Sequence, residues 1–346
     1  MKKQEFAILW QKTKAKTAKL LRVYAKEPEL MLPETIEGCL LTEIAPYCFA
    51  KAEHLPESEI LVTKVAVMCE NDEVYIIEEK RVTDENMRQT AEKFRVFCGD
   101  YVKKISLPLS VIAVGNLAFY NCVNLEELSI GKAMQEVGSD AFMNCRSLST
   151  LLVHGNVRER SFVQQILSQI SSGIEVVFCE KTKQVKIFYP EYQEFYDEIA
   201  PAHIFRRKME GEGFRARQSF TDGVVDLARY DLIFPRACVE ENEDTLLHLA
   251  MDRLLYPVDL KKAAQLLYEN YVKEHAEALM KKLIKAHALF EIGFLCEKQY
   301  VSEDVMEKAI AVATDCEWAE GVASLLEWKR KFFQKEGKDR YTFDEF

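Results

Sequence analysis

Ile105-Ser-Leu-Pro-Leu-Ser-Val-Ile-Ala-Val-Gly-Asn-Leu-Ala-Phe-Tyr-Asn-Cys-Val-Asn-Leu125 is followed by a second version of the same pattern, Leu128-Ser-Ile-Gly-Lys-Ala-Met-Gln-Glu-Val-Gly-Ser-Asp-Ala-Phe-Met-Asn-Cys-Arg-Ser-Leu148. Each matching residue recurs after 23 positions, as Gly115 and Gly138 do. The frame continues through Leu151 and Val153 and then stops matching. Self-similarity at a constant period of this length is the signature of a solenoid in which each repeat is one coil.

These coils resemble the BspA-like leucine-rich-repeat family, whose repeats read roughly I-x-L-P-x-S-V-x-x-I-G-x-x-A-F-x-x-C-x-x-L. An earlier, degenerate coil follows the same order of residues. It consists of Leu30-Met-Leu-Pro33, Leu41-Thr-Glu-Ile44, Phe49 and Leu55, with Ala45 and Ala52 in place of the repeat's Gly and Cys. A five-residue insertion, Glu37 to Leu41 around Gly38, is similar to a hairpin variant of such coils. The resemblance implies a solenoid of short parallel strands.

The repeated residues have distinct physical roles in such a coil. Alternating Leu and Ile make a short strand whose inward side chains are buried, and we expect Phe119 and Phe142 to stack on each other inside. Gly115 and Gly138 are expected to adopt backbone angles that other residues avoid. The resemblance implies that Cys122 and Cys145 are packing residues rather than redox or metal-binding ones.

The composition is that of an ordinary globular chain with an acidic balance. The 346 residues are 48% hydrophobic and 29% charged, and the net charge is -10 with a pI near 5.4. That balance argues against general binding of nucleic acid or anionic membrane, which needs a positive field. Residues 1–30 are an exception, because eight Lys or Arg and three Glu give them a local charge of +5.

The ten cysteines form no C-x-x-C pair, and no secretion signal or membrane span is recognisable. The first apolar run, Phe6 to Trp10, is too short for a signal peptide. No run approaches the roughly 18 apolar residues of a membrane-spanning helix. We therefore expect reduced thiols that are packed as small apolar groups, and a cytoplasmic protein.

Two further β elements are expected around the first coil. Residues 5–24 read as a hairpin in which Lys12, Lys14 and Lys16 alternate and share one face of a strand. That row is either a solvated hairpin tip or charged edge that prevents sheet-to-sheet pairing, or a site for an acidic partner. Residues 56–104 interrupt the repeat with a hairpin of Val65–Met68 and Val74–Ile77. A helix with Thr83 as N-cap, Met87, Ala91, Phe94 and Cys98 on its buried face and Gly99 past its end is expected to follow.

Helical periodicity replaces the repeat in the C-terminal part. Expected helices are 243–255, 260–272, 274–285, 287–298, 303–314 and 318–333, with short connections that favour antiparallel pairs. Asp244-Thr-Leu-Leu-His-Leu-Ala250 is similar to the ankyrin T-P-L-H-x-A helix start. His248 within it is expected to be buried or to bond the turn rather than to bind a ligand.

The predicted fold class is mixed α and β: an N-terminal leucine-rich-repeat solenoid with short parallel strands, followed by an all-α helical-repeat domain. The expected domains are a hairpin cap at 1–28, the solenoid at 29–157, a capping helix and terminal strands at 158–190, a junction at 191–242, the ankyrin-like helices at 243–333 and a tail at 334–346.

No catalytic, metal-binding or cofactor-binding signature is present, so we expect a non-enzyme without cofactor or metal. The segment from Phe205 to Arg217 gives the strongest indication of a binding site, because a glycine turn beside arginines can hold an anion. Arg206, Arg207, Gly211, Gly213, Arg215 and Arg217 are the anion-binding candidates. The alternative is a structural junction in which the arginines pair with nearby acids.

The 23-residue offset aligns outward residues of successive strands into columns, which a protein partner could contact. The partner-binding candidates are Lys103, Glu126 and Ser149; Lys104, Glu127 and Thr150; and Ser106, Ser129 and Leu152. The alternative is an ordinary solvated sheet face. A cleft between the solenoid and the helical domain is a second possible binding place.

Three functions remain open at this stage. The first is an intracellular protein-interaction or scaffold module with a protein partner, and the absence of catalytic motifs favours it. The second is a secreted or surface BspA-like adhesin, which a signal peptide would favour. The third is a polyanion binder that uses the N-terminal lysine row or the segment from Arg206 to Arg217. The sequence determines neither the partner nor the oligomeric state.

Overall fold

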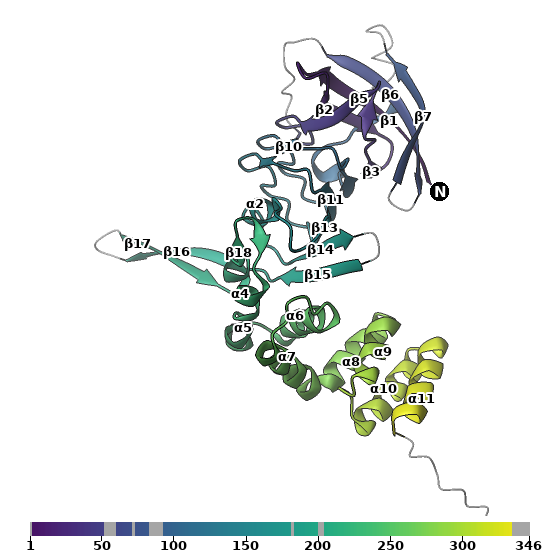
Figure 1. Ribbon diagram of the computed structural model, residues 1–346, viewed down its shortest axis with the longest axis vertical. Coiled ribbons are helices and arrows are strands. Elements are labelled where there is room, and N and C mark those ends of the chain that lie inside the picture. The colour runs from purple at the N-terminus through teal and green to yellow at the C-terminus, as the bar shows by residue number, and fades with distance from the viewer. Residues whose placement is uncertain are drawn as a thin grey trace, which may run out of the picture. The chain divides into compact units, whose positions relative to one another are not determined.

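The computed structural model of the protein is shown in Figure 1 and describes residues 2–51, 60–70, 73–82, 93–180, 183–199 and 204–333. The chain divides into two compact units, Met1–Glu240 and Glu241–Phe346, which we call the solenoid unit and the helical unit. Strands dominate the first and helices make up the second, which confirms the predicted mixed α and β fold class. The predicted limits of the smaller domains stay a prediction.

Short parallel strands, one from each coil, form the first sheet of the solenoid unit. Glu127 pairs with Lys104 on one side and with Thr150 on the other, and Ile130 pairs with Val153. These registers reproduce the offset of the sequence repeat, so the predicted solenoid is confirmed. From one edge to the other the strands are β3 Glu29–Met31, β9 Lys104–Ser106, β11 Glu127–Gly131, β13 Thr150–His154, β14 Ile174–Glu180 and the antiparallel β15 Lys183–Tyr189.

The degenerate first coil is also present. Leu30 of β3 pairs with Ile105 of β9. The predicted insertion forms a hairpin of β4 Thr35–Ile36 and β5 Cys39–Ile44, whose two turn residues, Glu37 and Gly38, both have positive φ. Turns of that kind match the twist of the flanking strands. Residues 52 and 55 of this coil lie outside the described residues.

The solenoid continues beyond the point at which the repeat frame is lost. β14 pairs in parallel with β13, and Val153 lies beside Phe178, which is slightly further along the chain than another exact repeat would place the partner. The short helix α2 Val163–Leu167 lies between the two strands in the chain and buries Val163, Ile166 and Leu167. The final strands that were predicted after this helix are therefore confirmed, and the first of them adds another coil to the solenoid.

The second sheet joins the other side of the coils to the N-terminal hairpin and to the insertion. The predicted hairpins are both present, and Phe6 on β1 pairs with Ala25 on β2 and with Val65 on β6. The insertion therefore extends the N-terminal hairpin. The strand order is β12 Glu136–Val137, β10 Ala113–Val114, β5, β2 Ala18–Ala25, β1 Lys2–Lys12, β6 Leu61–Glu70 and β7 Glu73–Arg81.

Two local predictions in this region are wrong. Lys12 ends β1, whereas Lys14 and Lys16 lie in the turn that the Thr13 and Thr17 backbone and hydroxyl groups close, so the three lysines do not share a strand face. The predicted helix starting at Thr83 lies mostly outside the described residues, but its expected end does not. β8 Arg95–Val96 is a strand that pairs with Tyr24 and Ala25 of β2, so the buried helical face cannot extend to Cys98.

A column of phenylalanines fills the inside of the coils. The rings of Phe119 and Phe142 lie 5.1 Å apart and are nearly parallel, and the rings of Phe49 and Phe119 lie 4.6 Å apart. Phe97 closes the column edge-on against Phe49, at 6.1 Å. The predicted stacking is confirmed, and it begins one coil earlier than the two best-matching repeats.

The cysteine column runs beside the phenylalanines. The Cys122 thiol donates to the Phe49 carbonyl at 3.3 Å, and the Cys145 thiol donates to the Phe119 carbonyl at 3.2 Å. Burial raises the pKa of Cys145 to about 12, and burial also raises the pKa of Cys122. Thiols that stay protonated and bonded to the previous coil serve packing, as expected.

Gly115 and Gly138 were expected to adopt backbone angles that other residues avoid. That prediction is wrong, because neither has a positive φ. A Cβ on Gly138 would lie 2.5 Å from Asn116 Oδ1, and one on Gly115 would lie 2.7 Å from Pro46 Cδ. The glycines are therefore required by the close approach of the neighbouring coil. The left-handed turns fall elsewhere, at positions that recur in the same frame as the repeat: Leu117 and Asp140, and Asn121 and Asn144.

The rest of the solenoid unit is a set of short elements after β15. A two-stranded hairpin, β16 Gln193–Ile199 and β17 Ile204–Glu210, pairs with no other described strand. It leads into the short helix α3 Gly213–Ala216. The remaining elements are β18 Phe220–Thr221, β19 Val224–Val225, α4 Leu227–Asp231 and α5 Phe234–Glu240.

The helical unit contains the six helices expected from the sequence. They are α6 Glu243–Leu255, α7 Lys262–Glu274, α8 Ala276–Lys285, α9 Leu289–Glu297, α10 Glu303–Asp315 and α11 Ala319–Phe333. Consecutive helices pack as pairs, α8 also packs against α10, and α9 packs against α11. His248 on α6 is half-exposed and lies 3.7 Å from the Asp252 carboxylate one turn later.

Candidate protein-interaction surface

The outward side chains of the first sheet form the surface that the repeat predicts, which we call the strand face. Its first column contains Lys103, Glu126 and Ser149, which are all exposed and directly precede their strands. The second contains Lys104, Glu127 and Thr150, and the third contains Ser106, Ser129 and Leu152. The structure brings all nine candidates into these aligned columns.

The sheet also adds residues that the repeat did not reveal. β3 places Glu29 beside Lys104 and Met31 beside Ser106, and β14 places Glu175 beside Thr150 and Val177 beside Leu152. The terminal strands were predicted, but their place in the columns was not, because the repeat spacing is not kept between β13 and β14. The alternation of β14, Ile174-Glu-Val-Val-Phe178, was nevertheless a usable signal, since the outward Glu175 follows the inward Ile174.

Charges along the second column alternate over its first three strands, from Glu29 through Lys104 to Glu127. Lys2 Nζ lies 3.8 Å from the Glu29 carboxylate, and Lys104 Nζ lies 3.7 Å from the Glu127 carboxylate. Lys186 on β15 lies 3.1 Å from Glu175. Pairs this exposed contribute little to stability. They give the strand face a pattern of charges of both signs that a complementary partner could read.

The third column changes from polar to apolar along the solenoid. Ser129 is buried, and its hydroxyl lies 2.9 Å from Nε2 of His154 on the next strand. Leu152 on β13 is partly exposed, whereas Val177 on β14 is buried. The strand face therefore combines a charged column with the partly exposed Leu152, and charged and apolar side chains together are typical of a protein interface.

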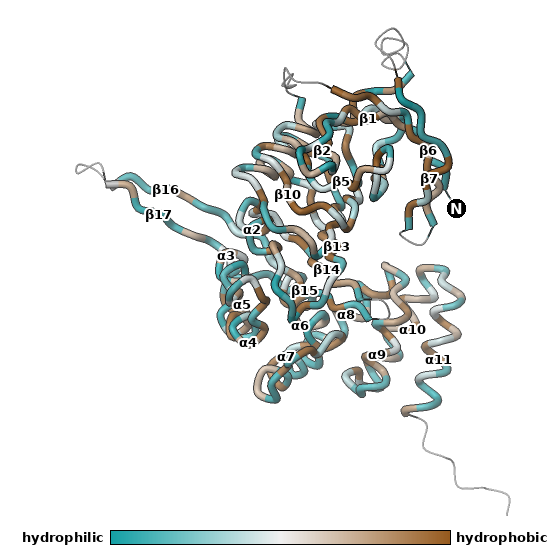
Figure 2. Tube along the Cα trace, turned by 45° about the horizontal axis from the view of Figure 1, so that its top comes forward, coloured by the Kyte–Doolittle hydropathy of each residue, from teal (hydrophilic) through white to brown (hydrophobic). Residues whose placement is uncertain are grey.

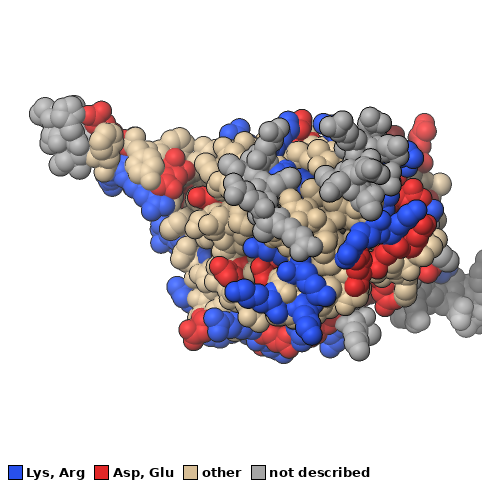
Figure 3. Space-filling model, turned by 90° about the horizontal axis from the view of Figure 1, so that it is seen from above, with Lys and Arg blue, Asp and Glu red and all other residues tan. Residues whose placement is uncertain are grey.

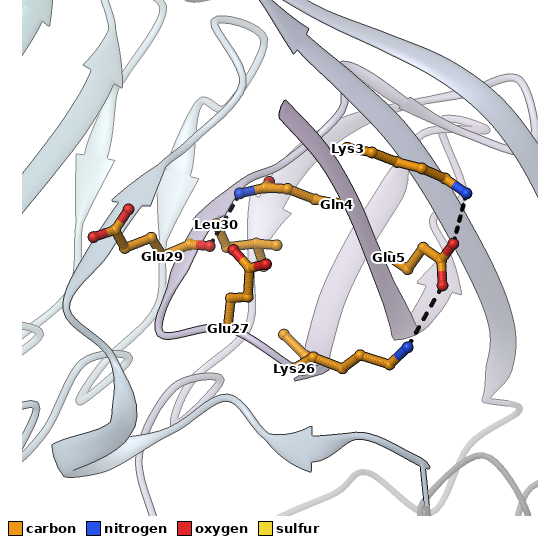
Figure 4. Close-up of a pocket in the computed structure, with 8 residues that line it drawn as sticks. Lys3, Gln4, Glu5, Lys26, Glu27, Glu29 and Leu30 are labelled. Atoms are coloured by element: carbon orange, nitrogen blue, oxygen red, sulfur yellow. Dashed lines mark hydrogen bonds and ion pairs between the residues drawn. The ribbon is translucent and has the colours of Figure 1, made fainter. Parts of the chain in front are cut away.

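A small charged cleft lies where the N-terminal strand meets β3, and Figure 4 shows it in close-up. Gln4 is buried there. Its amide nitrogen donates to the Glu29 carbonyl at 3.1 Å, and its amide oxygen accepts from the Met31 N–H at 3.0 Å. The side chain thus occupies the place of a further strand along β3. Glu5 lies between Lys3 and Lys26, at 2.7 and 3.6 Å.

The groups that line this cleft close the free edge of β3 rather than form a ligand site. The volume of the cleft is about 190 Å³, and its charged groups already have partners, since Glu5 pairs with Lys3 and Lys26 and Glu27 pairs with Lys2. The unpaired N–H and C=O groups of an edge strand can pair with another chain. The Gln4 amide prevents this on β3 because it bonds to those groups. No feature of the sequence pointed to this role of Gln4.

The six anion-binding candidates do not meet on one surface. Arg206 and Arg207 lie exposed on β17, and Arg207 Nη2 donates to the Glu194 carboxylate at 3.0 Å. Arg215 pairs with the buried Glu212. Gly211 has a φ of +87°, and Gly213 lies against the Pro190 carbonyl, which leaves no room for a Cβ.

Arg217 has a structural environment. It is buried, and its guanidinium donates to three carbonyls: Pro190 at 2.5 Å, Gly213 at 3.0 Å and Ser172 at 2.6 Å. The guanidinium also lies 5.1 Å from the centre of the Tyr192 ring. Burial lowers the pKa of Arg217 to about 10, so it remains charged at neutral pH. It joins the last coil to the segment that begins at Pro190.

Arg217→Met is expected to lower the free energy of unfolding of the solenoid unit by about 1–3 kcal/mol, because three buried carbonyls lose their donor. Arg206→Met, on the exposed β17, should change it by no more than about 0.5 kcal/mol. Urea unfolding followed by circular dichroism measures both. Equal stabilities of the two variants would contradict the role given to Arg217.

Comparison with known proteins supports the interpretation of the coils. The family model for the BspA type leucine rich repeat region, described as six copies, matches residues 93–189. A search of the curated proteins and a search of the solved structures each found no significant match. Among the described residues, none of the helices has the length and apolar character that crossing a membrane would need. The segment from residue 93 to residue 189 is thus a BspA-type leucine-rich-repeat region that folds as a solenoid.

Proposed function

We propose that the protein is a non-catalytic, intracellular interaction or scaffold module that binds a protein partner through the strand face. The observation that carries the proposal is the alignment of Lys104, Glu127 and Thr150 in one column, beside the column that contains the partly exposed Leu152. A rigid sheet holds these side chains at fixed spacing, so a partner can bind without ordering them first.

Reduced thiols favour an intracellular location over the adhesin alternative. None of the ten cysteines, all of which lie in the described ranges, forms a disulfide, and Cys122 and Cys145 are among those that are buried. Proteins that work in oxidising compartments usually use such residues in disulfides. An adhesin role nevertheless fits the matched family, so localisation is a separate measurement. Fractionation and protease treatment of intact cells would find the protein protected if it is intracellular and degraded if it is a surface adhesin.

The helical unit supports a second repeat array, which we infer to be ankyrin-like. His287, Gln299 and Glu317 all have positive φ at helix ends. The residue after each donates to a carbonyl five positions back, as Ala288 does to Leu283 and Trp318 does to Ala313. The turns at His287 and Glu317 are separated by one helix pair, α9 and α10, and the helices around them pack in two rows, α8 with α10 and α9 with α11. Stacked helix pairs of this kind commonly present binding surfaces.

Substitutions on the strand face test the proposed function. Lys104→Glu combined with Leu152→Arg should lower the affinity for the protein partner at least tenfold, since it reverses a charge in one column and places a charge at an apolar position of the next. Glu136→Lys is the matched control, because Glu136 is equally part of a solenoid strand but lies exposed on β12 of the other sheet. Circular dichroism verifies that the variants are folded.

Affinity purification with each variant, followed by binding measurements with the purified partner, provides the comparison. A partner that is retained by the wild type and by Glu136→Lys but lost by the strand-face variant supports the proposal. Recovery of the same proteins at the same affinity by all three would rule the strand face out as the binding surface.

A further inference from the structure

The hairpin of β16 and β17, which we call the arm, extends away from the rest of the solenoid unit (Figures 1 and 2). It forms a sheet of two strands, and no other described strand joins it. A two-stranded hairpin on its own is marginally stable in water. At the base, Tyr192 packs against Phe214, and the Arg207 guanidinium lies 5.7 Å from the centre of the Phe214 ring. The described arm beyond that base lacks a covering layer of its own.

One face of the arm is aromatic and highly exposed. Tyr196 pairs with Arg207 across the strands, and alternation places Glu194, Glu198, Phe205 and Met209 on the same face. Tyr196 is 64% exposed and Phe205 is 67% exposed. Phe195, on the opposite face, is less exposed, at 40%. Large aromatic side chains that protrude together from a thin ribbon are typical of a surface that becomes buried in a complex.

The two strands of the arm carry opposite charges. β16 contains Glu194, Asp197 and Glu198 and no basic residue, whereas β17 contains Arg206, Arg207 and Lys208 with a single acid, Glu210. In Figure 3 basic side chains follow one edge of the arm, while tan and red side chains occupy the rest of it. Hydrogen bonds from Tyr196 and from Arg207 lower the pKa of Glu194, so this acid is ionised at neutral pH.

We propose that the arm is a self-association element, and that its aromatic face packs against the same face of the arm of a second copy. Charge selects the geometry of this contact. A two-fold axis parallel to the arm lays the acidic β16 of one copy over the basic β17 of the other, in both directions. A two-fold axis across the strands would lay acidic strand on acidic strand, and pairing of two β17 edges would bring like charges together.

The register of the hairpin then predicts the opposing side chains. Tyr196 and Arg207 occupy the same level of the ladder, so the axis places Tyr196 of one copy opposite the partner's Arg207. Glu194 and Glu198 lie one step to either side of that guanidinium. A guanidinium stacked on an aromatic ring and flanked by carboxylates is a favourable arrangement, and the symmetry produces it twice. The contact is independent of the strand face and of any partner bound there.

Sedimentation velocity on the full chain over a concentration series tests the proposal. The wild type should show a concentration-dependent monomer–dimer equilibrium. Tyr196→Ser with Phe205→Ser should raise the dimer dissociation constant at least about tenfold, since aromatic anchors carry most of the energy of an interface. Phe195→Ser, on the opposite face, is the matched control and should leave the constant within about twofold. A wild type that stays monomeric at the highest concentration, or a control with the same loss, would overturn the proposal.

A charge exchange makes the test specific for the proposed geometry. Glu194→Lys with Glu198→Lys makes the aromatic face wholly basic, and Arg207→Glu makes it wholly acidic, so each variant alone should remain monomeric. A mixture of the two variants should form a heterodimer, because every facing charge is again opposite. A mixture that fails to associate, while the wild type does, would show that the arms do not meet in this way.

Discussion

Phe119→Ala is expected to lower the free energy of unfolding of the solenoid unit by about 3–5 kcal/mol, the usual cost of truncating a core phenylalanine. Phe119 is the middle ring of the column, with Phe49 at 4.6 Å on one side and Phe142 at 5.1 Å on the other. All three rings are fully buried. The coils hold the rings at a spacing set by the stacked strands, so the cavity cannot close by a local shift. Urea or thermal unfolding followed by circular dichroism measures the loss.

Two further variants separate the effect of stacking from the effect of size. Phe142→Ala removes the ring at the end of the described column, which stacks on Phe119. It should cost less than Phe119→Ala, within the same range of about 3–5 kcal/mol. Phe290→Ala, at a residue of the helical unit that is 69% exposed, should cost about 0.5 kcal/mol or less. A Phe119→Ala variant no less stable than Phe290→Ala would contradict the ring column.

Sequence reasoning succeeded where a structural property repeats along the chain. The 23-residue offset predicted the parallel register of β9, β11 and β13, because each coil buries its apolar residues only when it stacks in register on the next. Helical periodicity predicted α6 to α11 to within a few residues for the same kind of reason. Each is a local pattern that is read several times, and repetition compensates for the weakness of any single match.

Sequence reasoning failed where pairing joins segments that are distant in the chain. Nothing in the local sequence of the insertion predicted that β6 would pair with β1, from Lys2 to Trp10, and continue its sheet. Arg95 and Val96 were expected in a helix, but an edge of β2 at Tyr24 and Ala25 recruits them into a strand. Tertiary pairing of this kind overrides local propensity, and the segment itself carries no signal of it.

The same distinction explains the candidate surfaces. The nine strand-face residues could be predicted because the repeat alone places them in columns. The arginines from Arg206 to Arg217 were grouped because they are close in sequence. In the structure a glycine turn separates those on β17 from those on and after α3, so they do not share one surface. The arm that contains Arg206 and Arg207 has a different feature of interest, the separation of charge between two strands, which appears only once β16 and β17 are known to pair.

Gly138→Ala is expected to lower the free energy of unfolding of the solenoid unit by about 1–3 kcal/mol, or more where the coils cannot separate. A Cβ at this position would lie 2.5 Å from Asn116 Oδ1 and 2.6 Å from the Gly115 carbonyl carbon of the preceding coil. Backbone atoms of a stacked coil cannot rotate away, so the coils would have to move apart along the solenoid. Gly155→Ala is the matched control, because its Cβ would meet only the Lys132 side chain, at 3.3 Å.

Gly138→Asn distinguishes close approach from backbone conformation as the reason for the repeated glycine. Asparagine tolerates a positive φ, as Asn121 and Asn144 do in these coils, so it would be milder than alanine if the glycine supplied left-handed backbone angles. Since Gly138 has no positive φ and no space beside it, we expect asparagine to be at least as damaging as alanine. Chemical unfolding of the three variants against the wild type ranks them. A Gly138→Asn protein more stable than Gly138→Ala would show that the turn, and not the neighbouring coil, requires glycine.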